Sequence, residues 1–195
     1  TLTTYTNKGF IYNVDVRLRP NGSKGVLVKN ILDYKNYYLK HAQNWEIQAL
    51  LKARPVSISS AFKHLTKEFM SMVKDVLLKR ANEISWKEIS SMREKIVKEL
   101  TQEKGIDIKF APGGIEDIEF YIQWLQLKNI SKNTSLLVQN TMTALNRLYK
   151  ASVIELEFKN KIYKAYNYYR KVETFLKLND VHVLEDPELI EIGTK

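Results

Sequence analysis

The chain has 195 residues and carries 31 Lys and Arg against 22 Asp and Glu, a net charge of +9. Hydrophobic residues make up 44% and charged residues 27%, so the chain has enough apolar side chains for a core and is neither disordered nor of low complexity. The absence of Cys excludes disulfide scaffolds, thiol nucleophiles and thiolate zinc sites. No stretch approaches the ~18 apolar residues of a membrane span, and the first residues lack a signal-peptide pattern. A cytoplasmic protein without a membrane partner is therefore expected.

A β ribbon is predicted near the start of the chain. Residues 11–18 are rich in β-forming side chains, residues 20–23 (PNGS) have turn chemistry, and residues 26–28 (VLV) suit a second strand. No other segment gives a convincing strand pattern.

Three charged residues, Asp15, Arg17 and Arg19, share one face of the first predicted strand, because side chains alternate along a strand. A carboxylate on a rigid strand suits Mg²⁺, and neighbouring guanidinium groups suit phosphate oxygens. The same pattern is also typical of the charged outer face of an ordinary strand. The residues alone leave both interpretations open.

Helical spacing of the apolar residues begins near residue 31 and continues almost to the end of the chain. Gly105 and the Pro112-Gly113-Gly114 break interrupt it, with a short extended link expected over 106–110. Helices are predicted over 31–51 as one or two elements, and over about 59–77, 86–101, 115–127, 134–149 and 152–178. The predicted fold class is α+β, mostly α: a β ribbon followed by a bundle of about six helices.

Two helical segments carry charged residues that suit either structure or function. Glu116, Asp117 and Glu119 follow the two glycines at the start of one helix, where acidic side chains complement the positive helix end. They would repel a phosphate bound there, and a metal or substrate role stays open. Lys52 and Arg54 lie near the end of another helix, where they complement its negative end.

Four blocks of sequence, in this order, resemble the glutamate-ammonia ligase (glutamine synthetase) adenylyltransferase family. They are YNVDVRLRPNGSKG at 12–25, WEIQALLKAR at 45–54, MREKI at 92–96 and DIKFAPGGIEDIEF at 107–120. The resemblance covers about residues 10 to 180. It implies the C-terminal strands of a polymerase-β-like nucleotidyltransferase domain in residues 1–30, a helical bundle in 31–180 and a C-terminal tail in 181–195.

The resemblance also implies an activity: transfer of AMP from ATP to a tyrosine of glutamine synthetase, or its removal by phosphorolysis in a second, paired domain. In such enzymes three carboxylates hold Mg²⁺. Asp15 matches the third of them, and Arg17 and Arg19 match positions that face phosphate or neighbouring acids. The implied cleft-lining or substrate residues on the bundle side are Glu46, Lys52, Arg54, Lys109, Gly113, Gly114, Asp117 and Glu119.

The other two metal carboxylates of the family lie in an Asp-x-Asp segment that has no counterpart here. The chain is therefore expected to be a fragment with an incomplete active site. Three blocks, WEIQAL, MREK and DIK before GGIEDIEF, favour the transferring copy. YRKVE at 169–173 and the segment after it favour the removing copy.

Three alternatives remain. In the first, the chain is a non-catalytic docking or regulatory module that binds glutamine synthetase or a nitrogen-signalling protein. In the second, it belongs to a related uridylyltransferase that modifies a signal protein. A nucleic-acid binder is the third; it is suggested by the positive charge, Trp124 and the tyrosines at 163–169, but the acidic cluster at 116–119 argues against it.

Overall fold

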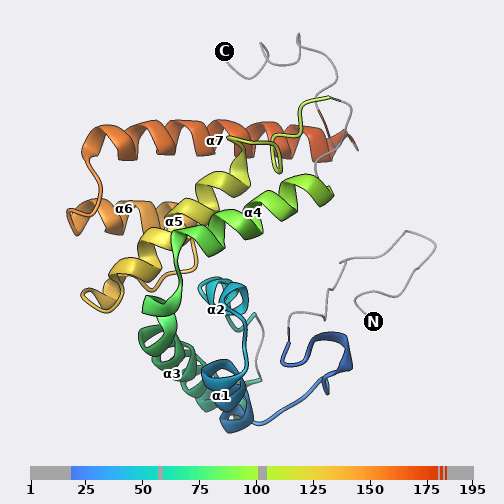
Figure 1. Ribbon diagram of the computed structural model, residues 1–195, viewed down its shortest axis with the longest axis vertical. Coiled ribbons are helices and arrows are strands. Elements are labelled where there is room, and N and C mark those ends of the chain that lie inside the picture. Colours follow the sequence, from blue (N-terminus) through green and yellow to red (C-terminus); the bar gives the residue numbers. More distant parts are fainter. Residues whose placement is uncertain (1–18, 57–58, 101–104, 180, 182, 184–195) are drawn as a thin grey trace.

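The described residues, 19–56, 59–100, 105–179, 181 and 183, form an assembly of helices in the computed structural model (Figure 1). The α-helices are α1 (Ile31–Lys40), α2 (Asn44–Leu50), α3 (Lys63–Arg80), α4 (Trp86–Leu100), α5 (Ile115–Asn129), α6 (Thr141–Lys150) and α7 (Leu156–Leu178). Short 3-10 helices are η1 (Gly22–Lys24), η2 (Ser60–Phe62), η3 (Ala81–Glu83) and η4 (Thr134–Leu136). These bounds confirm most of the helices predicted from apolar spacing to within a few residues, but the helix predicted over 134–149 begins only at Thr141, after the separate turn of η4.

The α+β fold class is wrong for this structure, because the described residues contain helices and no strand. Val26, Leu27 and Val28 were expected to form the second strand, but they are 59%, 68% and 84% exposed and adopt no regular structure. A strand needs a hydrogen-bonding neighbour, and β-branched residues alone do not supply one. The expected partner strand, at 11–18, lies outside the described residues.

The turn before that segment is confirmed. Asn21 and Gly22 have positive φ angles of 66° and 56°, and η1 begins at Gly22. The link at 106–110 differs from its extended prediction, since residues 108–110 form a turn.

Polar side chains fix the starts of three helices. Asn30 accepts a hydrogen bond from the backbone of Asp33 at the start of α1, and Asn140 does the same for Thr143 at the start of α6. Glu46 completes a capping box with Gln43 at the start of α2. Each interaction satisfies a backbone N–H that a helix end leaves without a partner.

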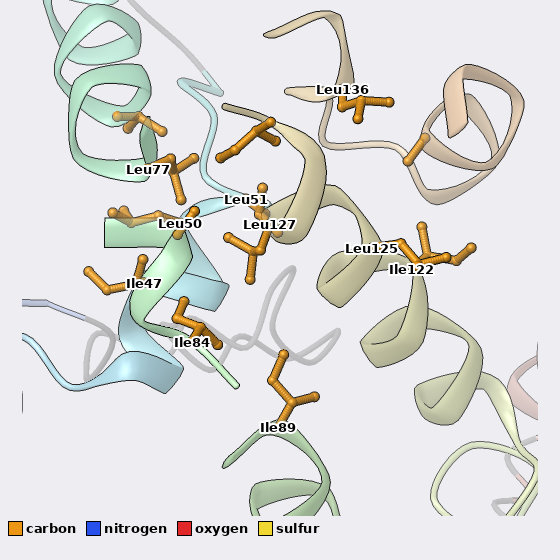
Figure 2. Close-up of a cluster of buried hydrophobic side chains, with 14 of the residues drawn as sticks. Ile47, Leu50, Leu51, Leu77, Ile84, Ile89, Ile122, Leu125, Leu127 and Leu136 are labelled. Atoms are coloured by element: carbon orange, nitrogen blue, oxygen red, sulfur yellow. The ribbon is translucent and has the colours of Figure 1, made fainter. Parts of the chain in front are cut away.

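Helix α5 is central: it contacts α2, α4, α6 and α7. Helices α1 and α3 pack together at one end of the long axis, and α7 lies at the other end (Figure 1). The apolar face predicted for α5 is confirmed, because Ile115, Ile118, Ile122 and Leu125 are all at most 8% exposed. Figure 2 shows the core around this helix, with side chains from α2, α3, α4 and η4 packed beside those of α5.

None of the helices in the described part of the chain combines the length and the apolar character that crossing a bilayer requires.

Candidate functional site

The residues predicted to hold metal and phosphate lie at the edge of the described structure. Asp15 and Arg17 fall outside the described residues. The side chain of Arg19 turns back onto its own loop, where Nε and Nη2 donate to the carbonyl oxygen of Gly25 at 3.2 and 3.1 Å. Nη2 also donates to the carbonyl oxygen of Ser23 at 3.3 Å. Arg19 therefore helps to hold the turn that leads into the helices.

The loop before α5 is built on Asp107 and the two glycines. One carboxylate oxygen of Asp107 accepts hydrogen bonds from the backbone N–H groups of Lys109 and Phe110, both at 2.9 Å. Gly113 has a φ of +82°, a conformation that favours glycine. A Cβ on Gly114 would lie 2.5 Å from the carbonyl oxygen of Ile108. Gly114 is thus required by the close approach of the backbone.

Arg93 of α4 joins this loop to α5. Its Nη2 donates to the carbonyl oxygens of Phe110 and Ala111 at 2.7 and 3.2 Å. Its Nε lies 2.7 Å from Oδ1 of Asp117, and Oδ2 of Asp117 accepts a hydrogen bond from the backbone of Gly113. The Arg93 side chain is only 8% exposed. Two of the recognised sequence blocks, at 92–96 and 107–120, are therefore parts of one structural unit.

A second group of polar side chains, which we call the Glu119 cluster, ties α5 to α7 and to the chain after α2. Oε1 of Glu119 accepts hydrogen bonds from the Tyr166 hydroxyl and from Nη2 of Arg170, both at 2.6 Å. Nζ of Lys52 lies 3.6 Å from Oε2 of Glu119 and donates to the Thr141 hydroxyl at 2.7 Å. The cluster consists of Lys52, Glu119, Thr141, Tyr166 and Arg170. Of its members, Lys52 and Glu119 were predicted site residues.

The electrostatics of this region follow from burial and from close charges. Burial, and next the negative charge of Glu119, raise the pKa of Glu116, although Lys109, Arg93 and Arg170 oppose the shift. Burial and the hydrogen bond to Glu119 raise the pKa of Tyr166. Burial disfavours the charged form of Arg170, but its hydrogen bonds to Glu173 and Tyr166 outweigh that effect and raise its pKa.

The charged groups of the Glu119 cluster pair with one another and with neighbouring charges of α7. Arg170 pairs with both Glu119 and Glu173 at 2.6 and 2.7 Å, and Lys177 pairs with Glu173 at 2.9 Å. Within the described ranges no group of three or more His, Asp or Glu side chains is placed to hold a metal ion. The described helices thus offer an interhelical polar network rather than a metal centre.

The remaining predicted residues are dispersed. Glu46 serves the α1–α2 junction, where it accepts hydrogen bonds from the Tyr37 hydroxyl at 2.9 Å and from the backbone of Gln43 at 2.8 Å. The ammonium group of Lys109 lies 4.6 Å from the ring centre of Phe110. Arg54 is exposed.

Sequence reasoning missed the central roles of Arg93, Tyr166 and Arg170. Arg93 lies in a recognised block but received no role. Tyr166 and Arg170 are one helical turn apart, a spacing that places both side chains on the same face of α7. That spacing was the available signal for a shared partner.

Two family models match different parts of the chain. The model described as glutamate-ammonia ligase adenylyltransferase matches residues 1–72. The model described as GlnD PII-uridylyltransferase matches residues 88–183.

Curated relatives extend the similarity to nearly the whole chain. Bifunctional glutamine synthetase adenylyltransferase/adenylyl-removing enzymes of Cutibacterium acnes and Chromobacterium violaceum are each 34% identical to it, over 95% and 96% of the chain. The enzyme of the same name from Psychromonas ingrahamii is 42% identical over 63% of the chain. The matches to the first two cover 19% and 21% of those enzymes, so the chain spans about a fifth of their length.

Proposed function

This chain belongs to the family of bifunctional glutamine synthetase adenylyltransferase/adenylyl-removing enzymes, and we propose that it serves their nucleotidyl-transfer chemistry as part of a longer polypeptide. The observation that carries the proposal is the 34% identity to such enzymes over 95% of the chain. The activity in question moves AMP from ATP to a tyrosine of glutamine synthetase, or removes that AMP with phosphate. Its expected location is the cytoplasm.

The packing of the described helices supports this proposal. Arg93, Asp117 and Glu119 lie in the sequence blocks that carry the resemblance, and each joins one element to another. In the proposed division, residues 31–180 form the helical bundle, residues 1–30 belong to the nucleotidyltransferase domain, and 181–195 form a tail.

In the transfer direction, the tyrosine oxygen forms a bond to the α-phosphorus of ATP, and the bond from that phosphorus to pyrophosphate breaks. The proton of the tyrosine hydroxyl is released to solvent in this step. We assign Mg²⁺ binding to Asp15 together with carboxylates elsewhere in the polypeptide, where the metal would stabilise charge on the α-phosphoryl group. The proposed part of the described residues is to hold the helices in place beside the reacting groups, through the ion pairs that join α4, α5 and α7.

In this proposal the Glu119 cluster and Arg93 are positioning groups. Their side chains pair with one another and with backbone carbonyls, which holds α4, α5 and α7 in one arrangement. Of the two paired activities, we assign the chain to AMP transfer, on the blocks at 45–54, 92–96 and 107–120.

A second candidate is uridylyl transfer to a signal protein. It is favoured by one observation, the match of residues 88–183 to the PII-uridylyltransferase model. The two functions differ in nucleotide and in acceptor. The same helical part suits either, because the two family models match different stretches of it.

The nucleotide and the acceptor therefore provide the test. The full-length protein that contains this chain is incubated with Mg²⁺ and α-labelled ATP or UTP, in the presence of glutamine synthetase or of a PII-type signal protein. We expect label from ATP on glutamine synthetase alone. Label from UTP on the signal protein would instead support the second candidate. If the protein binds glutamine synthetase without Mg²⁺ or nucleotide and transfers no label, the docking-module alternative holds.

A further inference from the structure

An open cleft with a volume of about 620 Å³ lies between the α1–α2 junction and α4. Trp45 of α2 lines one side, Lys40 lies at the end of α1, and Lys87, Ser91 and Lys95 of α4 line the other side. None of the residues assigned to the proposed chemistry lines this cleft. Its volume is within the range of ligand-binding pockets, about 300–1,000 Å³.

The cleft is strongly basic. Lys40, Arg80, Lys87 and Lys95 line it, whereas Glu88 is the one acidic residue among its lining residues, all of which the structure describes. Glu88 is already engaged: it accepts hydrogen bonds from Nδ2 of Asn44 at 2.7 Å and from the backbone of Ser85 at 2.9 Å. Hydrogen bonds from the backbone and the hydroxyl of Ser85 lower its pKa, so the carboxylate stays charged and occupied. Among the residues that line the cleft, no further acid is available to pair with the lysines.

Arg80 forms the floor of the cleft rather than a binding group. Its Nη1 donates to the carbonyl oxygens of Tyr38 and Ala42 at 2.9 and 2.8 Å, and its Nε pairs with Glu83 at 2.8 Å. The Arg80 side chain is 13% exposed. It therefore fixes the α1–α2 junction against α3, which keeps the cleft open.

The binding groups of α4 form a stripe. Lys87, Ser91 and Lys95 are four residues apart, so they lie on one helix face, and the two lysines are separated by about 12 Å along the axis. In an extended peptide, residues four apart are separated by about 13 Å and point to the same side. Two carboxylates at that spacing would therefore match the two lysines.

Trp45 supplies an apolar contact opposite this stripe. It is 41% exposed, and Met92 lines the same cleft. A single phosphate group fits less well, because the exposed lysines are spread along the helix and the one arginine is already bonded to carbonyl groups. An extended chain with carboxylates at both ends of a short segment and an apolar side chain between them fits both features.

We infer that the cleft between α2 and α4 is a docking site for an extended acidic segment of a protein partner. Lys87 and Lys95 pair with carboxylates four residues apart, and Trp45 packs against an apolar residue between them that points to the opposite side of the extended segment. This inference does not rest on the proposed function, since it holds whether the bundle accompanies a catalytic domain or acts alone.

The test uses the full-length protein and a fluorescein-labelled extended peptide with two glutamates four residues apart and a leucine directly after the first, because that position points to the opposite side from the glutamates. Fluorescence anisotropy should show binding that weakens as salt is added, because exposed charge pairs are screened. A peptide with lysines in place of the glutamates should not bind. ATP and inorganic phosphate should not displace the acidic peptide; displacement by either would overturn the inference in favour of a phosphate site.

Matched charge reversals locate the binding surface. Lys87→Glu with Lys95→Glu should reduce the affinity for the acidic peptide about tenfold or more, since two attractive pairs become repulsive. Lys164→Glu with Lys171→Glu on α7 changes the net charge by the same amount. This variant should reduce the affinity for the acidic peptide less than about threefold. All four lysines are exposed, so both variants should fold as the wild type does. Equal losses would show a general effect of charge and overturn the inference.

A third variant tests the apolar contact. Trp45→Ala should weaken peptide binding about threefold to tenfold, because it removes a large exposed aromatic surface from the cleft. Unchanged binding in this variant, together with loss in the lysine variant, would contradict the proposed position of the leucine.

Discussion

The ion pair between Glu119 and Arg170 should measurably stabilise the packing of α5 against α7. The pair has an N–O distance of 2.6 Å, and the Glu119 side chain is only 14% exposed. A hydrogen bond to a charged group contributes about 1.5–3 kcal/mol when well buried. Because the Arg170 side chain is 40% exposed, solvent screening reduces that value, and we expect a coupling free energy of about 1–2 kcal/mol.

A double-mutant cycle isolates this coupling. Glu119→Gln, Arg170→Met and the double variant are unfolded in urea, and the free energy of unfolding is followed by circular dichroism. The control cycle uses Glu157 and Lys161, a pair within α7 with an N–O distance of 2.7 Å. Their side chains are 77% and 74% exposed. That surface pair should couple by less than about 0.5 kcal/mol. A coupling for Glu119 and Arg170 no larger than the control value would refute the stabilising role of the cluster.

Three further predictions concern the loop before α5 and the acids that follow it. Gly114→Ala should lower the free energy of unfolding by about 1–3 kcal/mol, because its Cβ would meet a backbone oxygen at 2.5 Å. Gly113→Ala has open space around it and should lower the free energy of unfolding by only about 1 kcal/mol. Equal costs would contradict the steric explanation. Arg93→Met should cost about 2–4 kcal/mol and speed hydrogen exchange in the loop at 105–114, and exchange unchanged from wild type would contradict its role. Because the pKa of Glu116 is raised in the folded state, its ionisation lowers stability as the pH rises above the ordinary Glu range. Glu116→Gln should therefore stabilise the protein near neutral pH and have little effect at about pH 4, and urea denaturation at both values tests this; a stabilisation independent of pH would contradict it.

Most of the helices could be predicted from the sequence because their signals are local. The apolar spacing of α5 and the break at 112–114 depend on neighbouring residues alone, and the structure reproduces both. The prediction of a second strand was wrong because its signal is not local alone. Val26–Val28 has a local preference for extended structure, but a strand also depends on a partner, which local sequence does not reveal.

The site could be predicted only in part. Glu119 and Lys52 were selected from the family resemblance, and the structure places their charged groups 3.6 Å apart. The contacts of Glu119 with Arg170 and Tyr166 span about fifty residues of sequence and depend on how α7 crosses α5. Single-sequence patterns contain no information on that crossing.

The most direct test of the central claim, that the chain serves AMP transfer to glutamine synthetase, is the paired assay of Asp15→Asn in the full-length protein. Transfer is measured with α-labelled ATP and unmodified glutamine synthetase, removal with phosphate and the adenylylated form, and Asp33→Asn, at the start of α1, is the matched control. We expect Asp15→Asn to lose transfer by about a hundredfold or more while removal and the control remain near wild type. Wild-type rates of transfer in Asp15→Asn would contradict the claim.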